Sequence, residues 1–96
     1  MRARIIWVSP VDGGRSSLPT GERYVTVARF PEDGERWHEE AWSVVVEASP
    51  PPAEQGNPTF GDARFLVDDA PLERLRPGRS FELYEGTRRV ATVDLV

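Results

Sequence analysis

Residues 81–96 have the sequence FELYEGTRRVATVDLV, and this stretch decides the fold class. Two runs that alternate apolar and polar residues, 81–84 and 90–96, flank a short polar segment, 85–88, that contains a glycine. Alternation with a period of two is the pattern of a strand with one buried face, and a short glycine-containing break joins two such strands into a hairpin. The sequence therefore predicts a β-hairpin here.

Four further runs upstream have the same character. β-Branched and aromatic residues are concentrated in each run, and glycine or proline interrupts the chain between them. The six predicted strands cover residues 2–8, 24–30, 42–48, 63–67, 81–84 and 90–96. Such short strands, with at most one helical turn and no repeat, indicate an all-β sandwich or barrel. We favour a closed six-stranded antiparallel barrel of Greek-key type, because closure removes the exposed strand edges that promote aggregation.

The alternation also predicts which side chains are buried. Every second residue of a run lies on the same face of an extended chain, and in each run one of the two faces carries most of the apolar residues. We expect a core that contains Ile5, Trp7, Val44, Val46, Phe65, Phe81, Leu83 and Val93. Residues 49–57, in contrast, are rich in proline and lack any large apolar side chain, so we expect them to form a mobile surface loop.

Length and composition limit what the chain can be. With 96 residues, of which 39% are apolar and 29% charged, it matches a single folded domain over residues 1–96 with one modest core. No apolar stretch approaches the ~20 residues that cross a bilayer, and no signal-peptide pattern is present. The chain has no cysteine, which removes disulfides and thiolate metal sites, so we expect a cytoplasmic protein.

The net charge of −4 is distributed unevenly along the chain. Residues 1–31 carry five arginines and two acids (+3), residues 32–73 carry two arginines and eleven acids (−9), and residues 74–96 carry five arginines and three acids (+2). Nucleic-acid binding generally needs a dominant basic surface that neutralises phosphates. The overall sign therefore argues against a general nucleic-acid-binding protein.

Two segments resemble the C-terminal β-barrel domain of elongation factor Tu and related translation GTPases. Residues 8–15, VSPVDGGR, resemble its strand that runs into an acidic-Gly-Gly-Arg loop, and residues 75–91, LRPGRSFELYEGTRRVA, resemble its closing hairpin. The resemblance follows the strand order over most of the chain and implies that barrel as a stand-alone small protein. The GTPase motif Gly-x-x-x-x-Gly-Lys-Ser/Thr is absent, and a chain without lysine cannot contain it, so we expect no nucleotide.

The resemblance also implies a binding surface. In that family, the Gly-Gly-Arg loop and the glycine of the hairpin turn help to hold the T-arm backbone of aminoacyl-tRNA. These positions correspond to Arg15 and Gly86, and Arg88 and Arg89 lie beside them. From the residues alone, the segment 13–15 has two interpretations: an anion cradle made of backbone N–H groups, or an ordinary loop whose glycines satisfy backbone dihedral angles.

The sequence offers little for catalysis or metal binding. His38 is the only histidine, it lies in a charged connection, and no Gly-x-Ser-x-Gly motif occurs, so we expect no catalytic residue and no enzyme. Neighbouring acids such as Glu39 and Glu40 lack the fixed geometry of a metal cage when they belong to a loop. We accordingly expect neither a metal site nor a cofactor.

From these observations we expect a non-catalytic binding module whose partner is a protein. The acidic connection 32–40 contains Trp37, which no strand alternation places in the core. An exposed tryptophan near acidic residues suits a basic partner: Trp37 would supply the anchor, and Glu39 and Glu40 would steer association. The alternative is an RNA- or tRNA-binding accessory protein that uses Arg15, Gly86, Arg88 and Arg89. We also expect five arginines to gather near one end of the barrel: Arg74, Arg76, Arg79, Arg88 and Arg89.

Overall fold

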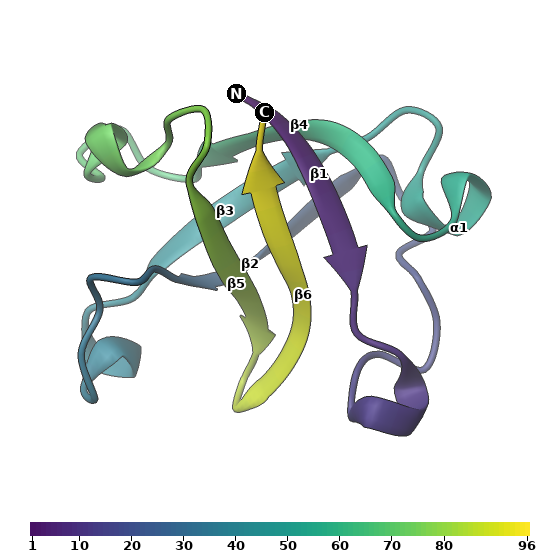
Figure 1. The fold of residues 1–96 in the computed structure, drawn as a ribbon, viewed down its shortest axis with the longest axis horizontal. Coiled ribbons are helices and arrows are strands. Elements are labelled where there is room, and N and C mark those ends of the chain that lie inside the picture. Colours follow the sequence, from purple (N-terminus) through teal and green to yellow (C-terminus); the bar gives the residue numbers. More distant parts are fainter.

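The computed structural model describes residues 1–96, which form a closed barrel of six antiparallel strands (Figure 1). The strands are β1 (Arg2–Trp7), β2 (Arg23–Arg29), β3 (Trp42–Glu47), β4 (Thr59–Phe65), β5 (Ser80–Glu85) and β6 (Arg88–Leu95). Helical segments are confined to the connections: η1 (Pro10–Asp12), η2 (Trp37–Glu39), α1 (Pro52–Gln55) and η3 (Leu72–Arg74). No helix is long and apolar enough to span a membrane. The predicted fold class is confirmed.

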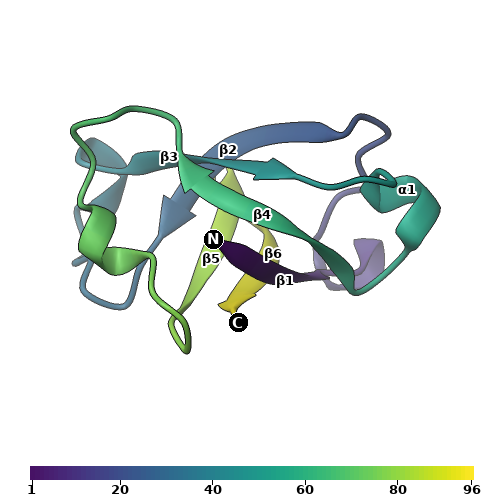
Figure 2. The same ribbon diagram turned by 90° about the horizontal axis from the view of Figure 1, so that it is seen from above.

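The strand order around the barrel is β1-β4-β3-β2-β5-β6, and β6 closes onto β1. Strands β2, β3 and β4 follow one another as neighbours, and β5 then returns beside β2, which is a Greek-key arrangement. Because neighbouring strands are antiparallel, the connections alternate between two ends. We call one the terminal end, formed by the two termini and residues 30–41 and 66–79, and the other the hairpin end, formed by residues 8–22, 48–58 and 86–87 (Figures 1 and 2).

The core fills the barrel interior with the inward-facing side chains of all six strands. Strand β4 alternates strictly between buried and exposed residues, and β1 and β5 bury alternate residues, Ala3, Ile5 and Trp7 in β1 and Phe81 and Leu83 in β5. All eight side chains predicted for the core are buried and belong to one cluster. Phe30 belongs to the same core cluster and stacks on Phe81, with 4.7 Å between the ring centroids. The predicted set of core residues is therefore confirmed.

The β5–β6 hairpin contains the turn that the sequence predicted, together with a bulge that it did not. Gly86 has a φ of +63° and Thr87 has no positive φ, as in a type II′ turn, which places glycine first. Leu83 pairs with Ala91 and Tyr84 pairs with Arg89, so Val90 is the extra residue of a β-bulge. The bulge interrupts the alternation, and Val90 and Ala91 are both fully buried.

Strand β4 differs from the prediction, which placed it at residues 63–67. It begins at Thr59 and ends at Phe65, while Leu66 and Val67 lie exposed beyond it. Its early part was missed because Gly61 has low strand propensity. The structure needs glycine there, since the carbonyl oxygen of Glu47 lies only 2.3 Å from where a Cβ would stand.

Residues 49–57, expected to form a surface loop because they lack a large apolar side chain, pack on the barrel. Pro52 in α1 is fully buried, and two side-chain amides tie the segment to the barrel. Asn57 accepts from the backbone N–H of Trp7 at 2.9 Å and donates to its carbonyl oxygen at 3.0 Å. Gln55 makes the same pair of bonds with Phe60. Each side-chain amide makes the two backbone hydrogen bonds that a neighbouring strand would otherwise make. The segment therefore covers the hairpin end of the barrel.

Candidate functional site

The two segments on which the family resemblance rests meet at the hairpin end. A guanidinium N–H of Arg15 donates to the carboxylate of Glu85, which immediately precedes Gly86. The hydroxyl of Tyr24 donates to the same carboxylate oxygen. The guanidinium carbon of Arg15 lies 5.4 Å from the centre of the Tyr24 ring. Three side chains from distant parts of the sequence thus form one partly buried cluster, which we call the Arg15–Tyr24–Glu85 cluster.

The electrostatics of this cluster favour the ionised carboxylate of Glu85 and the neutral phenol of Tyr24. Burial tends to raise the pKa of Glu85, but the hydrogen bonds from Tyr24 and Arg15 outweigh it, so the pKa is lowered. Burial and the hydrogen bond to Glu85 both raise the pKa of Tyr24. Burial alone would lower the pKa of Arg15, but the bond to Glu85 raises it overall. Arg15 therefore carries a charge that Glu85 already compensates.

The glycines before Arg15 have structural roles. Gly13 has a φ of +94°, the left-handed conformation that ends η1. A Cβ on Gly14 would lie 1.9 Å from the carbonyl oxygen of Val8, so only glycine allows the backbone to pass. The loop interpretation accounts for both residues without a bound anion.

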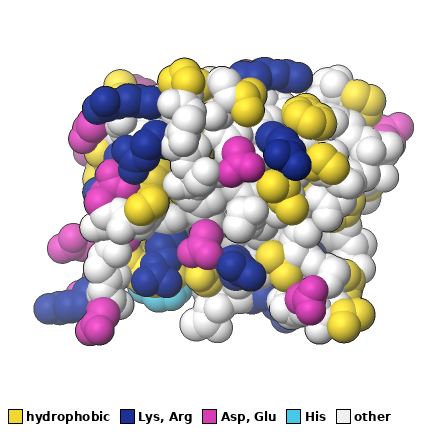
Figure 3. Space-filling view, in the orientation of Figure 1, with side chains coloured by type: hydrophobic (Ala, Val, Ile, Leu, Met, Phe, Trp, Pro, Cys, Tyr) yellow, Lys and Arg dark blue, Asp and Glu magenta, His cyan; other side chains and the backbone are white.

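The five arginines expected near one end do not gather there, and this prediction is wrong. Strand β5 separates them, because Arg79 precedes it at the terminal end whereas Arg88 follows it at the hairpin end. Arg89 pairs with Glu82 at 3.2 Å, and Arg88 is exposed without an ion-pair partner. Arginine and acidic side chains are also interspersed on the face shown in Figure 3. No extended basic surface results.

Trp37 is not the exposed anchor that the sequence suggested, and that prediction is wrong. Its side chain is 7% exposed, yet it does not belong to the barrel core. It packs against Tyr84 at 4.7 Å and His38 at 3.8 Å between ring centroids, and the guanidinium of Arg29 lies 5.5 Å from its ring. The acidic connection thus folds back and buries its tryptophan beside the barrel. Strand periodicity cannot reveal such a contact.

The same connection lines a groove of about 600 Å³ at the terminal end, which we call the acidic groove. Its charged lining consists of Glu32, Asp33, Glu35, Arg36, Glu39, Glu40 and Arg74. Arg74 holds Asp33 at 3.1 Å and Arg36 holds Glu39 at 2.7 Å. A hydrogen bond from Arg79 lowers the pKa of Glu32. Glu35 and Glu40 are exposed and form no ion pair, so the groove keeps an excess of negative charge.

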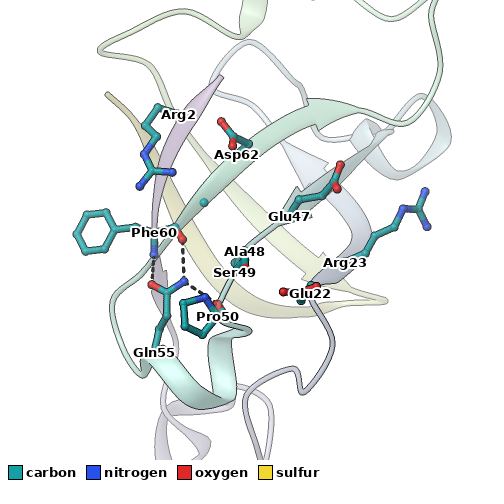
Figure 4. A pocket seen from close by; sticks show the side chains of 11 residues that line it. Arg2, Glu22, Arg23, Glu47, Ala48, Ser49, Pro50, Gln55, Phe60 and Asp62 are labelled. Carbon is teal, nitrogen blue, oxygen red and sulfur yellow. Dashed lines mark hydrogen bonds between the residues drawn. The ribbon is translucent and has the colours of Figure 1, made fainter.

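A second groove of about 600 Å³ lies where β3 and β4 separate beside α1 (Figure 4). Arg2 and Phe60 stand on one side of it and Arg23 on the other, while Gln55 holds the backbone of Phe60. Its acidic residues are Glu22, Glu47 and Asp62. With two arginines and three carboxylates, neither sign dominates, and this groove indicates no particular ligand.

The structure divides the sequence-predicted site residues into two separate groups. Arg15, Gly86 and Arg88 lie at the hairpin end, and Glu39 and Glu40 line the acidic groove at the terminal end. Tyr24 and Glu85 were not among the predicted site residues, because no local pattern links residues that are 61 positions apart. No group of three or more histidine, cysteine or acidic residues is arranged to hold a metal ion. Neither a protein-family model nor a curated protein matches the chain.

Proposed function

We propose that this barrel is a non-catalytic binding module that recognises a positively charged region of a protein partner through the acidic groove. One observation carries the proposal: five carboxylates line this groove against two arginines, and two of the carboxylates, Glu35 and Glu40, have no cation of their own. A guanidinium or ammonium group of a partner would provide the missing charge.

Electrostatic complementarity of this kind acts mainly on association. A concave surface of one sign attracts a partner of the opposite sign and raises the association rate constant, and salt reduces the effect. Trp37 takes a different part from the one the sequence suggested. Since it is buried under the connection, it holds the carboxylates in place and contributes little surface for contact.

The arrangement around His38 supports a binding role over a catalytic one. The imidazole packs against Trp37 in a tilted arrangement and forms no hydrogen bond with a hydroxyl group. A general base would need a nucleophile within hydrogen-bond reach. We also propose a cytoplasmic location, which suits a chain without cysteine.

Charge-neutral substitutions in the groove test the proposal. The double variant Glu35→Gln, Glu40→Gln should weaken binding of a fluorescein-labelled arginine-rich peptide and flatten its salt dependence. Its matched control is Glu22→Gln, Glu54→Gln, which changes the net charge equally at exposed positions outside the groove. Fluorescence anisotropy over a salt series measures both. Equal weakening by the two double variants would show only general attraction to an acidic protein and would refute the proposal.

A second candidate function, RNA binding, rests on the contact between Arg15 and Glu85, because it brings together the segments that resemble the tRNA-binding barrel of elongation factor Tu. We propose that resemblance as a relationship of fold, which does not by itself carry function. Of the arginines that this candidate uses, Arg15 and Arg89 already pair with carboxylates, whereas Arg88 forms no ion pair. RNA binding predicts micromolar affinity for tRNA, a steep salt slope and a loss in Arg88→Gln. A flat titration would remove this candidate.

A further inference from the structure

We propose that the partner is a short segment that carries apolar residues beside its basic ones, and that the apolar residues occupy an apolar groove on the other side of η3 from the acidic groove. This inference rests on the proposed function and adds the anchor that Trp37 does not provide. The inference is based on two neighbouring surfaces, the acidic groove and the apolar groove.

This apolar groove is distinct from the groove of Figure 4 and encloses about 540 Å³ at the terminal end. Seven of the nine residues that line it are hydrophobic. Phe65 lies at its base with 6% exposure, whereas Leu66, Val67 and Leu72 are 43%, 43% and 64% exposed. Met1 also lines it and is 40% exposed. Half of the eight exposed large apolar residues of the protein therefore meet in one place, and apolar patches of this kind mark sites of interaction.

The two grooves are neighbours because they share one short element. Leu72, the first residue of η3, lines the apolar groove, and Arg74, its last residue, lines the acidic groove. Arg74 is held on that side by Asp33 and Glu32. Figure 2 shows the connection that carries η3 arching out from the end of β4 near the N-terminus. A single extended segment laid across η3 would reach both grooves.

The charges around the apolar groove match the same occupant. Residues 68–73 carry three carboxylates and no cation, and Asp68, Asp69 and Glu73 are all exposed without an ion-pair partner. Arg64 also lines the groove, but its guanidinium pairs with Glu47 at 2.9 Å. A segment that reaches this groove with arginine or lysine beside its apolar residues would therefore meet opposite charge on both sides of η3.

The size of the apolar surface favours a short segment over a second copy of the chain. Its four partly exposed side chains offer on the order of 300 Å² of apolar area. A stable dimer buries about 800 Å² on each partner. Two copies related by a twofold axis would also bring their unpaired carboxylates together, which opposes association. A peptide-sized anchor matches both the area and the charge.

A double-mutant cycle tests the inference. The probe is a fluorescein-labelled peptide in which a leucine pair is joined by a glycine linker to an arginine triplet, and a second peptide has serines in place of the leucines. The wild-type protein should bind the leucine peptide at least tenfold more tightly than the serine peptide. Leu72→Ser should remove most of that difference and leave the serine peptide unaffected. Val11→Ser, at a 95% exposed position of the hairpin end, is the matched control and should change neither.

Each result of this cycle has a distinct meaning. If both peptides bind equally well to the wild-type protein, with the expected loss in Glu35→Gln, Glu40→Gln, the apolar anchor is refuted and the proposed function stands. If neither peptide binds, the proposed function fails, and this inference fails with it. If sedimentation shows a wild-type dimer that Leu72→Ser dissociates, a second copy covers the groove, and the peptide assignment is overturned. Because Leu72 is exposed, an unchanged melting temperature shows that the variant remains folded.

Discussion

Replacing Trp37 by alanine should lower the free energy of unfolding by about 3 kcal/mol, the lower end of the range for a buried tryptophan. The side chain is 7% exposed and contacts Tyr84 and His38, so the substitution removes both the buried area and the aromatic contacts. The loss stays at the lower end because the space lies outside the barrel core, where water and neighbouring side chains can fill it.

This loss is large enough to measure and small enough to leave a folded protein. Domains of this size have unfolding free energies of about 5–15 kcal/mol, and each kcal/mol moves the melting temperature by about 4–8 °C. Urea unfolding followed by far-UV circular dichroism is the appropriate assay, because the substitution removes a fluorescent tryptophan. A change below 1 kcal/mol would mean that Trp37 is exposed, as the sequence suggested, and would refute its packing against Tyr84.

Three further predictions concern the barrel itself. Phe81→Ala should cost roughly 3–5 kcal/mol, since Phe81 is 3% exposed and stacks in the core; a loss below 1 kcal/mol in urea would contradict the register. Gly61→Ala should cost about 1–3 kcal/mol, because its Cβ would overlap the carbonyl oxygen of Glu47, and an unchanged melting temperature would show that the strands can move apart. The lowered pKa of Glu85 stabilises the fold above its unfolded pKa of about 4.3. Acid titration should therefore show stability falling as the pH drops below this value, and Glu85→Gln should flatten the change; an identical acid profile in the variant would exclude this contribution.

Most of the barrel could be predicted from local sequence, because an antiparallel strand with one buried face leaves a period of two in the chain. The runs that contain Val44 and Leu83 were placed correctly, although Val45 in the first run is buried together with Val44 and Val46. The errors fall where another requirement overrides it. Gly61 lies inside a strand because a carbonyl group approaches its backbone, and the bulge at Val90 turns two successive residues inward.

The candidate sites were less predictable, because they depend on contacts between distant parts of the chain. Trp37 is buried by Tyr84, which lies 47 positions further along, and nothing in its own segment signals that contact. The charge map did predict an acidic connection, and the structure adds which of its carboxylates Arg74 and Arg79 neutralise. The apolar groove was missed since Leu66 and Val67 were assigned to a strand that in fact ends before them.

The most direct test of binding at the terminal end is to map the contact surface by NMR. Backbone amide shifts of the ¹⁵N-labelled protein would be followed as the leucine–arginine peptide is added. We expect the changes to concentrate in residues 32–40 and 66–75, with little change around Arg15 and Gly86. Changes centred on residues 13–17 and 85–89 would place the binding surface at the hairpin end and would contradict recognition by the acidic groove.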